Sequence, residues 1–243
     1  MILRLLVDPP APAAWNMAVD EAMLTLGNAP TLRLYSWAPY AVSLGYFQRA
    51  ADFADLPAGT TIVRRLTGGG AIHHGDELTF SLALDATLLP PSVAESYVLL
   101  HDAVVGTLAE LGILSERVAA GHGQSPRPAD RWCFASAGRD DLITPRGKLL
   151  GSAQRRIQQP RPRVLHHGSL VLQRPSLTPF VAAIADARHT DALLPDLRAR
   201  LASNLARALE LELVPGELTA AERALAAHLQ VARYENPAFV QLR

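Results

Sequence analysis

The chain has 243 residues, of which 49% are hydrophobic and 19% charged, a balance that fits a folded globular protein and excludes a disordered one. Its 23 basic and 23 acidic residues cancel, so a strongly basic nucleic-acid binder is excluded as the default class. The single cysteine, Cys133, excludes an internal disulfide and a multi-cysteine metal site.

The first half of the chain is predicted to form short strands separated by turns. Apolar residues at helical spacing predict one helix there, at 16–26. Strands are expected at 2–7, 31–37, 41–44, 61–65 and 78–84.

A longer helix is predicted from Ser92 to about Gly112. Ser92 and Glu95 can satisfy each other's backbone amides as a capping box, and Gly112 has the place of a C-terminal cap. The next elements are expected to be a loop and then two paired strands, at 121–131, 148–156 and 164–172.

The last third of the chain is predicted to be helical, at 179–188, 194–211 and 219–232. A capping box of Thr219 and Glu222 opens the last helix. Leucines at every fourth position form one apolar stripe, namely Leu197, Leu201, Leu205 and Leu209.

This order of elements predicts an α+β fold, a mixed and largely antiparallel sheet flanked by helices. We expect a single domain over 1–243, with a core at 1–175 and a helical C-terminal segment at 176–243. No apolar run reaches about 18 residues, and the start of the chain lacks the features of a signal peptide. We therefore expect a cytoplasmic protein without a membrane span.

The most unusual stretch is Arg64–Arg65–Leu66–Thr67–Gly68–Gly69–Gly70–Ala71–Ile72–His73–His74. Consecutive glycines after a strand allow positive φ and a close approach of the backbone to a ligand. Exposed amides in such a loop can bind an acyl carbonyl or a phosphate. A flexible hairpin loop is the alternative interpretation.

Two further residues are candidates for chemistry. Lys148 begins an apolar strand beside the small residues Gly151–Ser152–Ala153, where a lysine can act as a charge clamp or a base. A solvated turn is the alternative. Cys133 is either a small buried hydrophobic residue or a reactive thiol.

The histidines favour a structural role over metal binding. His166 and His167 are adjacent on a predicted strand, so at most one of them faces a given site. Neither they nor His73 and His74 show the spacing of zinc or iron ligands, and no metal site is expected.

Taken in order, these stretches resemble the biotin/lipoate protein ligase superfamily, on its lipoate and octanoate side. The resemblance spans roughly 1–175, and the biotin-ligase signatures are absent. The matching pieces are 16–21, 31–37, 43–48, 64–74, 77–81, 147–156 and 166–169. The resemblance implies the mixed sheet that is already expected, and it implies one of two reactions.

The first reaction is octanoyl transfer from acyl carrier protein to the lysine of a lipoyl domain, with Cys133–Phe134 in the place of the transferase cysteine. The second is ATP-dependent lipoate ligation through lipoyl-adenylate, which needs ATP and Mg²⁺, whereas the transferase needs no cofactor. A non-catalytic carrier-binding member is a third possibility. Gly70 and the run 138–142 resemble the ligases more than the transferases. Gly75 departs from the sequence patterns of both groups.

The resemblance also implies roles for particular residues. Cys133 and Lys148 are the expected catalytic pair, with Lys148 stabilising the thiolate and later accepting a proton. The residues expected to bind the acyl group, its oxyanion or an adenylate are Arg65, Thr67, Gly68, Gly69, Gly70, Ala71, His74, Gly151, Ser152, Ala153, His167 and Gly168.

An apolar slot and a docking surface complete the expected site. Leu44, Tyr46, Phe47 and Ile72 are the expected walls of the acyl pocket. Arg155, Arg156, Arg161 and Arg163 are the expected docking surface for acidic carriers. The expected partners are acyl carrier protein and lipoyl-domain proteins, namely 2-oxoacid dehydrogenase E2 subunits and the glycine cleavage H protein, with no nucleic acid or membrane.

Overall fold

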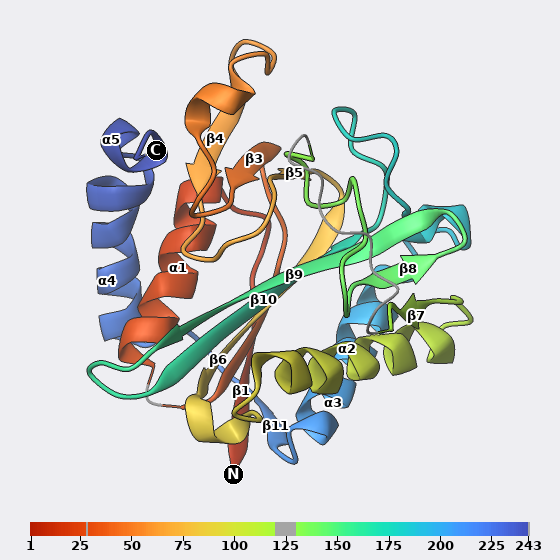
Figure 1. The fold of residues 1–243 in the computed structure, drawn as a ribbon. Coiled ribbons are helices and arrows are strands. Elements are labelled where there is room, and N and C mark those ends of the chain that lie inside the picture. The colour runs from red at the N-terminus through yellow and green to blue at the C-terminus, as the bar shows by residue number, and fades with distance from the viewer. Residues whose placement is uncertain (28, 120–129, 243) are drawn as a thin grey trace.

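A computed structural model describes residues 1–27, 29–119 and 130–242 of the chain. Its main element is an eight-stranded sheet in the order β11-β1-β2-β6-β10-β9-β8-β7, and a second sheet has the order β4-β3-β5 (Figure 1). The strands are β1 (Ile2–Val7), β2 (Thr31–Tyr35), β3 (Ala41–Leu44), β4 (Thr61–Arg64), β5 (Ile72–His74), β6 (Glu77–Asp85), β7 (Glu116–Arg117), β8 (Leu142–Thr144), β9 (Gly147–Ile157), β10 (Arg163–Val171) and β11 (Glu212–Pro215).

The large sheet is mixed, as predicted. β1 pairs in parallel with both β2 and β11, and the other pairings are antiparallel. The central strands β6 and β10 are buried almost throughout, which is expected for strands covered on both faces.

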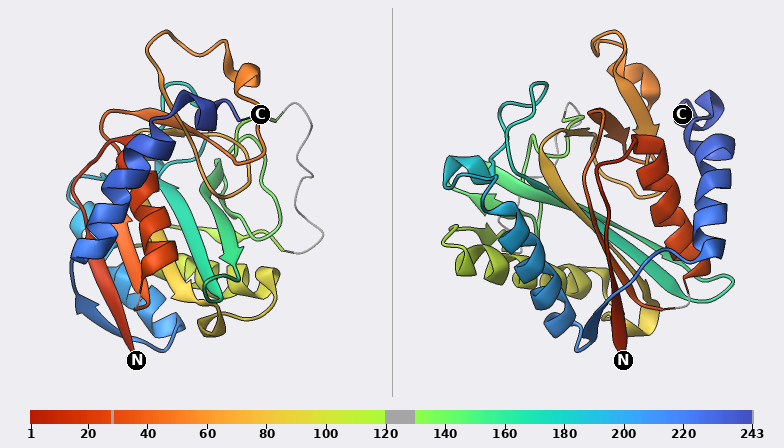
Figure 2. Two further views of the ribbon diagram at one scale, coloured as in Figure 1. Left: turned by 90° about the vertical axis from the view of Figure 1, so that its left-hand side faces the viewer. Right: turned by 180° about the vertical axis from the view of Figure 1, so that it is seen from behind.

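Helices cover both faces of this sheet (Figure 2). α2 (Val93–Glu110) and α3 (Leu194–Ala208) pack with one face in a leucine-rich core. α1 (Ala13–Leu26) and α4 (Ala220–Leu229) lie side by side and pack against the other face. A π-helical turn (Gln230–Tyr234) and α5 (Pro237–Val240) end the chain, and no helix of the described residues is both long and apolar enough to cross a membrane.

Most of the predicted elements are confirmed. β1 and β3 have the predicted bounds, and α1 begins three residues before the predicted 16. The α3 leucine stripe is buried, and the capping box of Thr219 and Glu222 is present. Ser92 caps α2 by accepting a hydrogen bond from the Glu95 amide. Most of the predicted loop at 121–131 lies outside the described residues.

Two predictions in the C-terminal segment are wrong. Only a 3₁₀ turn, Ile184–Asp186, forms within the predicted helix at 179–188. Val181, Ala182, Ala183 and Ile184 are all buried, and four consecutive buried residues cannot lie on one face of a helix. The predicted helix at 194–211 ends at Ala208, and β11 then joins the edge of the large sheet beside β1.

One transverse row of the large sheet positions the site. Gly151 of β9 is opposite Ser169 of β10, Ser169 is opposite Thr79 of β6, and Thr79 is opposite Tyr35 of β2. Directly opposed residues point to the same face. The row therefore runs under the small sheet from β9 to β2, on the face that α1 covers.

Candidate active site

The glycine loop, Gly68–Gly70, lies between β4 and β5, and hydrogen bonds from Arg65 fix its conformation. The Arg65 guanidinium donates to the carbonyl oxygens of Gly68 (3.0 Å) and Gly70 (2.9 Å) and to both oxygens of Ser43. Gly69 has φ +92°, a conformation that L side chains rarely adopt. Within the described part of the chain, the amides of Gly68–Gly70 donate to no acceptor, and Gly68 and Gly69 line the pocket.

Cys133 is fixed to the end of this loop by backbone hydrogen bonds. Its amide donates to the Ala71 carbonyl (2.8 Å), and the Ala71 amide donates to the Arg131 carbonyl (2.8 Å). A Cβ at Gly70 would lie 2.7 Å from the Cys133 nitrogen. Glycine is therefore required at position 70 for the two segments to meet.

Lys148 lies beside this cysteine, as predicted. Its Nζ donates to the Cys133 carbonyl (2.8 Å), is 3.5 Å from Cys133 Sγ and pairs with Asp141 at 2.7 Å. Burial alone lowers the pKa of Lys148, but the negative charges of Cys133 and Asp141 outweigh it, and the pKa of this ammonium is raised above its ordinary value. Lys148 is thus a permanent cation in the resting site.

Arg65 is a second cation on the sulfur side of the site. Burial lowers its pKa, and the charge of Cys133 is the largest influence in the opposite direction. Cys133 therefore lies beside two buried cationic side chains, Lys148 and Arg65.

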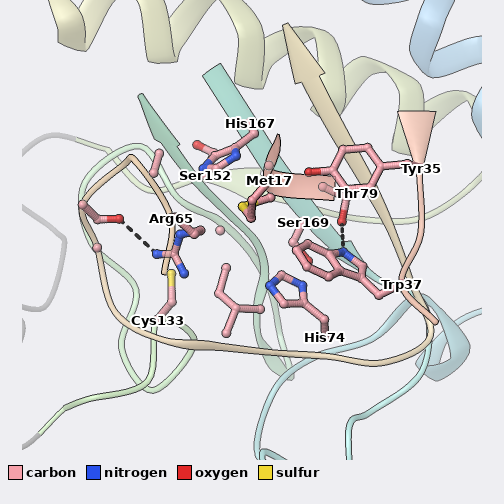
Figure 3. Close-up of a pocket in the computed structure, with 16 residues that line it drawn as sticks. Met17, Tyr35, Trp37, Arg65, His74, Thr79, Cys133, Ser152, His167 and Ser169 are labelled. Carbon is pink, nitrogen blue, oxygen red and sulfur yellow. Dashed lines mark hydrogen bonds between the residues drawn. The ribbon is translucent and has the colours of Figure 1, made fainter. Parts of the chain in front are cut away.

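The sulfur opens into a largely apolar pocket with an empty volume of about 370 Å³, solvent-open space included (Figure 3). Figure 3 shows Cys133 and Arg65 at one end of this pocket and Tyr35 and Trp37 at the other. Its lining residues are Met17, Tyr35, Trp37, Arg65, Gly68, Gly69, Ile72, His74, Thr79, Cys133, Gly151, Ser152, Ala153, His167, Gly168 and Ser169.

Two histidines are hydrogen-bonded to residues that support the loop. His74 Nδ1 donates to Glu77 (2.7 Å), so its Nε2 accepts from the Ser43 hydroxyl (2.6 Å), which in turn accepts from Arg65. Burial lowers the pKa of His74 although Glu77 opposes this, so the ring stays uncharged at neutral pH.

The second histidine is His167 of β10. Its Nδ1 donates to Asp20 (3.3 Å), and its Nε2 accepts from the Thr67 hydroxyl (2.7 Å). Burial raises the pKa of Asp20, but His167, Arg33 and Ser81 outweigh this and hold the pKa below its ordinary value. Asp20 therefore stays ionised and fixes the tautomer of His167.

The expected pocket walls are partly wrong. Ile72 does line the pocket, but Leu44 is fully buried in the core of the small sheet with Val42 and Phe53. Tyr46 and Phe47 stay outside, and Phe47 is 66% exposed beside Gly68 at the rim. Side chains alternate along β3, so while Ser43 contacts Arg65 and His74, its neighbour Leu44 points to the other side, into the core of the small sheet.

The expected docking surface is wrong at Arg163. Arg163 is fully buried, where it donates to the Gly27 carbonyl and pairs with Asp85. Arg161 donates to the same carbonyl, and Arg156 donates to the carbonyls of Pro90 and Pro91. Arg155 remains exposed, with its guanidinium over the Tyr46 ring.

Sequence reasoning missed several residues of the site. The pocket is also lined by Met17, Tyr35, Trp37, Thr79 and Ser169. Three carboxylates contact site residues: Asp20 contacts His167, Glu77 contacts His74 and Asp141 contacts Lys148. Asp20 and Glu77 lie in the stretches that carried the resemblance, which was a usable signal. Asp76, which follows Gly75, is exposed, accepts a hydrogen bond from the Tyr40 hydroxyl and does not line the pocket.

Gly151→Ala tests whether the sulfur must stay where the structure has it. The new Cβ would lie 2.9 Å from Cys133 Sγ, so the sulfur must move. We expect a loss of at least about tenfold in the rate of thiol modification by a small alkyl thioester, because misplacement of a reacting atom is costly. Gly106→Ala on α2 is the matched control, since nothing lies within 4 Å of its Cβ. An unchanged rate in Gly151→Ala would contradict the geometry.

The fold and the site together define the class of the protein, a catalytic domain of the lipoate-ligase type. Residues 12–222 match the family described as the lipoyl protein ligase A/B catalytic domain. The chain belongs to this family, as the sequence predicts.

Named relatives and solved structures are similar over nearly the whole chain. Octanoyltransferase LipM of Kyrpidia tusciae is 34% identical and that of Symbiobacterium thermophilum 35% identical, each with 95% of both chains covered. The structure of lipoate-protein ligase A bound with ATP has a TM-score of 0.80 at 24% identity over 99% of both chains. An archaeal bipartite lipoate protein ligase of Thermoplasma acidophilum, described with its E2 lipoyl domain, has a TM-score of 0.77 at 22% identity over 100% of this chain and 98% of that one. These two structures confirm the α+β fold.

Proposed function

We propose that this protein is an octanoyltransferase that moves an octanoyl group from acyl carrier protein to the lysine of a lipoyl domain through an acyl-enzyme on Cys133. One observation carries the proposal: Lys148 Nζ lies 3.5 Å from Cys133 Sγ where that sulfur opens into the pocket. The named LipM relatives support the same activity.

In the first step the Cys133 thiolate attacks the carbonyl carbon of the donor thioester. A bond forms between Sγ and that carbon, the carbon–sulfur bond of the donor breaks, and the donor leaves as a thiol after taking one proton. The free amides of Gly68–Gly70 are the donors for the tetrahedral oxyanion. Lys148 and Arg65 stabilise the thiolate before the attack.

In the second step the ε-amine of the acceptor lysine attacks the acyl-enzyme. The new carbon–nitrogen bond forms, the bond to Sγ breaks, and the amine must lose one proton. Acylation removes the negative charge of Cys133, the main influence that keeps the pKa of buried Lys148 high. The Lys148 ammonium can then give up its proton, which supplies the one that the departing donor thiol takes. The neutral amine of Lys148 next accepts the proton that the acceptor lysine loses, so the same residue serves both steps.

No ATP is needed for this exchange, because an amide is more stable than a thioester. The pocket supplies the binding of the acyl chain, at about 0.8 kcal/mol per buried CH₂. Met17, Tyr35, Trp37 and Ile72 provide its apolar walls.

We propose Arg155 as a docking contact for the acidic carrier proteins. It is exposed on β9 beside the rim formed by Tyr46 and Phe47. Arg155→Glu should reduce the rate of association with acyl carrier protein several-fold at low salt and have little effect at high salt. Arg188→Glu, at an exposed position between the 3₁₀ turn and α3, is the charge-matched control. Equal effects of the two changes would remove this docking proposal.

The alternative function is ATP-dependent lipoate ligation, which the likeness of the fold to ligases leaves open. The two are separated by supplying either octanoyl-acyl carrier protein without ATP or free octanoate with ATP and Mg²⁺. Octanoylation of a lipoyl domain with the first mixture is the expected result. Activity with the second mixture alone would favour the ligase, and activity with neither would favour a carrier-binding protein.

A further inference from the structure

The buried carboxylate of Glu77 is the end point of a chain of hydrogen bonds that starts at Arg65. Arg65 donates to the Ser43 hydroxyl (2.7 Å), and this hydroxyl donates to His74 Nε2 (2.6 Å). The other ring nitrogen, His74 Nδ1, donates to Glu77 Oε1 (2.7 Å). Glu77 is 3% exposed, and among the described residues it forms no ion pair with a lysine or an arginine.

The charge of Glu77 acts on Arg65 although the two side chains do not touch. Burial lowers the pKa of Arg65, and the negative charge of Glu77 opposes this, after those of Cys133 and Tyr35. An ionised carboxylate only accepts hydrogen bonds, so it fixes the direction of every link. His74 therefore presents a bare Nε2, and the Ser43 hydroxyl turns its lone pairs to Arg65.

A second set of contacts keeps Glu77 and His74 in place. The Trp37 ring is stacked on His74 with ring centroids 3.6 Å apart, and its indole donates to Thr79 (2.8 Å) (Figure 3). Thr79 in turn donates to Glu77 Oε1 (2.6 Å). These four side chains form a closed ring of contacts, so neither Glu77 nor His74 can rotate without breaking several of them.

The other end of the chain is the glycine loop. Arg65 donates to the carbonyls of Gly68 and Gly70 with the guanidinium nitrogen that does not contact Ser43. A peptide group is planar and trans, so its N–H points opposite to its C=O. The bond to the Gly68 carbonyl therefore sets the direction of the Gly69 amide, and Gly69 lines the pocket.

We infer that Glu77 is a positioning residue for acyl transfer, an inference that rests on the proposed function. Through His74 and Ser43 its carboxylate holds Arg65, and Arg65 holds the loop amides that donate to the oxyanion. Glu77 does not line the pocket, so it acts on the reaction only through these residues.

Glu77→Gln tests this role, because it keeps the shape of the side chain but removes its charge and adds a donor. Two reactions of Cys133 are compared by intact mass spectrometry. Acylation by octanoyl-acyl carrier protein builds an oxyanion, whereas alkylation by iodoacetamide does not. We expect acylation to slow by about tenfold or more and alkylation to stay within about threefold of the wild-type rate, because Lys148 remains beside the sulfur.

Ser43→Ala interrupts the same chain at its middle and should also slow acylation more than alkylation. In a protein that already carries Ser43→Ala, Glu77→Gln should slow acylation much less than it does in the wild type, because the connection is already broken. Glu222→Gln is the matched control: Glu222 is also a buried carboxylate, but it pairs with Arg4 and does not line the pocket. This variant should leave the ratio of the two rates unchanged, and melting temperatures of all variants check the fold.

The outcomes separate this inference from the proposed function. Equal slowing of acylation and alkylation in Glu77→Gln, or normal acylation, would overturn the positioning role. Fully independent effects of Glu77→Gln and Ser43→Ala would overturn it too. A wild-type protein that octanoyl-acyl carrier protein does not acylate would overturn the proposed function and this inference with it.

Discussion

Cys133→Ser is expected to lower octanoyl transfer by roughly three orders of magnitude or more. A serine hydroxyl fits the space of the thiol, but two cations at the distances of Lys148 and Arg65 do not ionise an alcohol at neutral pH. The acyl-enzyme then cannot form. Turnover of octanoyl-acyl carrier protein with a lipoyl-domain acceptor measures the effect.

A folding control and a turnover measurement decide how this result is interpreted. The melting temperature of Cys133→Ser should stay close to that of the wild-type protein, because Cys133 is only partly buried and its backbone makes the contacts that hold it. Near-normal turnover in the variant would exclude a covalent cysteine intermediate and favour ATP-dependent ligation.

Substitutions of Lys148 are expected to separate the two half-reactions. Lys148→Arg keeps a cation beside the sulfur but cannot accept a proton, since a guanidinium stays protonated in proteins. We expect acyl-enzyme to form at a rate within about tenfold of the wild type and its transfer to the lipoyl-domain lysine to slow by about a hundredfold or more.

Lys148→Met should impair both half-reactions, because it removes the cation beside the sulfur and the ion pair of half-buried Asp141, which keeps its hydrogen bond from the Gly138 amide. Single-turnover measurements of acylation and of transfer check both variants, with circular dichroism as the control for folding. Equal slowing of both steps in Lys148→Arg would contradict the role of Lys148 as proton acceptor.

The pairing of Cys133 with Lys148 could be predicted because Lys148 lies in a stretch that resembles a known family and Cys133–Phe134 has the place of the transferase cysteine in that family. The fold class could also be predicted, since the strands and helices follow their periodic patterns and caps. The helix at 179–188 was wrong because its apolar residues pack on all sides against neighbours distant in sequence, and periodicity carries no information about those neighbours.

The pocket itself was harder to predict. β2, β6 and β10 are buried on both faces, so alternation does not reveal which side chains meet the core and which meet the pocket. Tyr35, Thr79 and Ser169 therefore read as ordinary strand residues. Arg163 shows the opposite error. The neighbouring basic residues predicted an exposed position, but Arg163 is buried and its charge is compensated by Asp85 and the Gly27 carbonyl.

Intact mass spectrometry of the wild-type protein after brief mixing with octanoyl-acyl carrier protein tests the central claim most directly. The account predicts a mass increase of one octanoyl group that is lost with hydroxylamine, mapped to the peptide that contains Cys133, and absent in Cys133→Ala. An unmodified protein that nevertheless octanoylates a lipoyl domain, or an octanoyl group on any other residue, would contradict it.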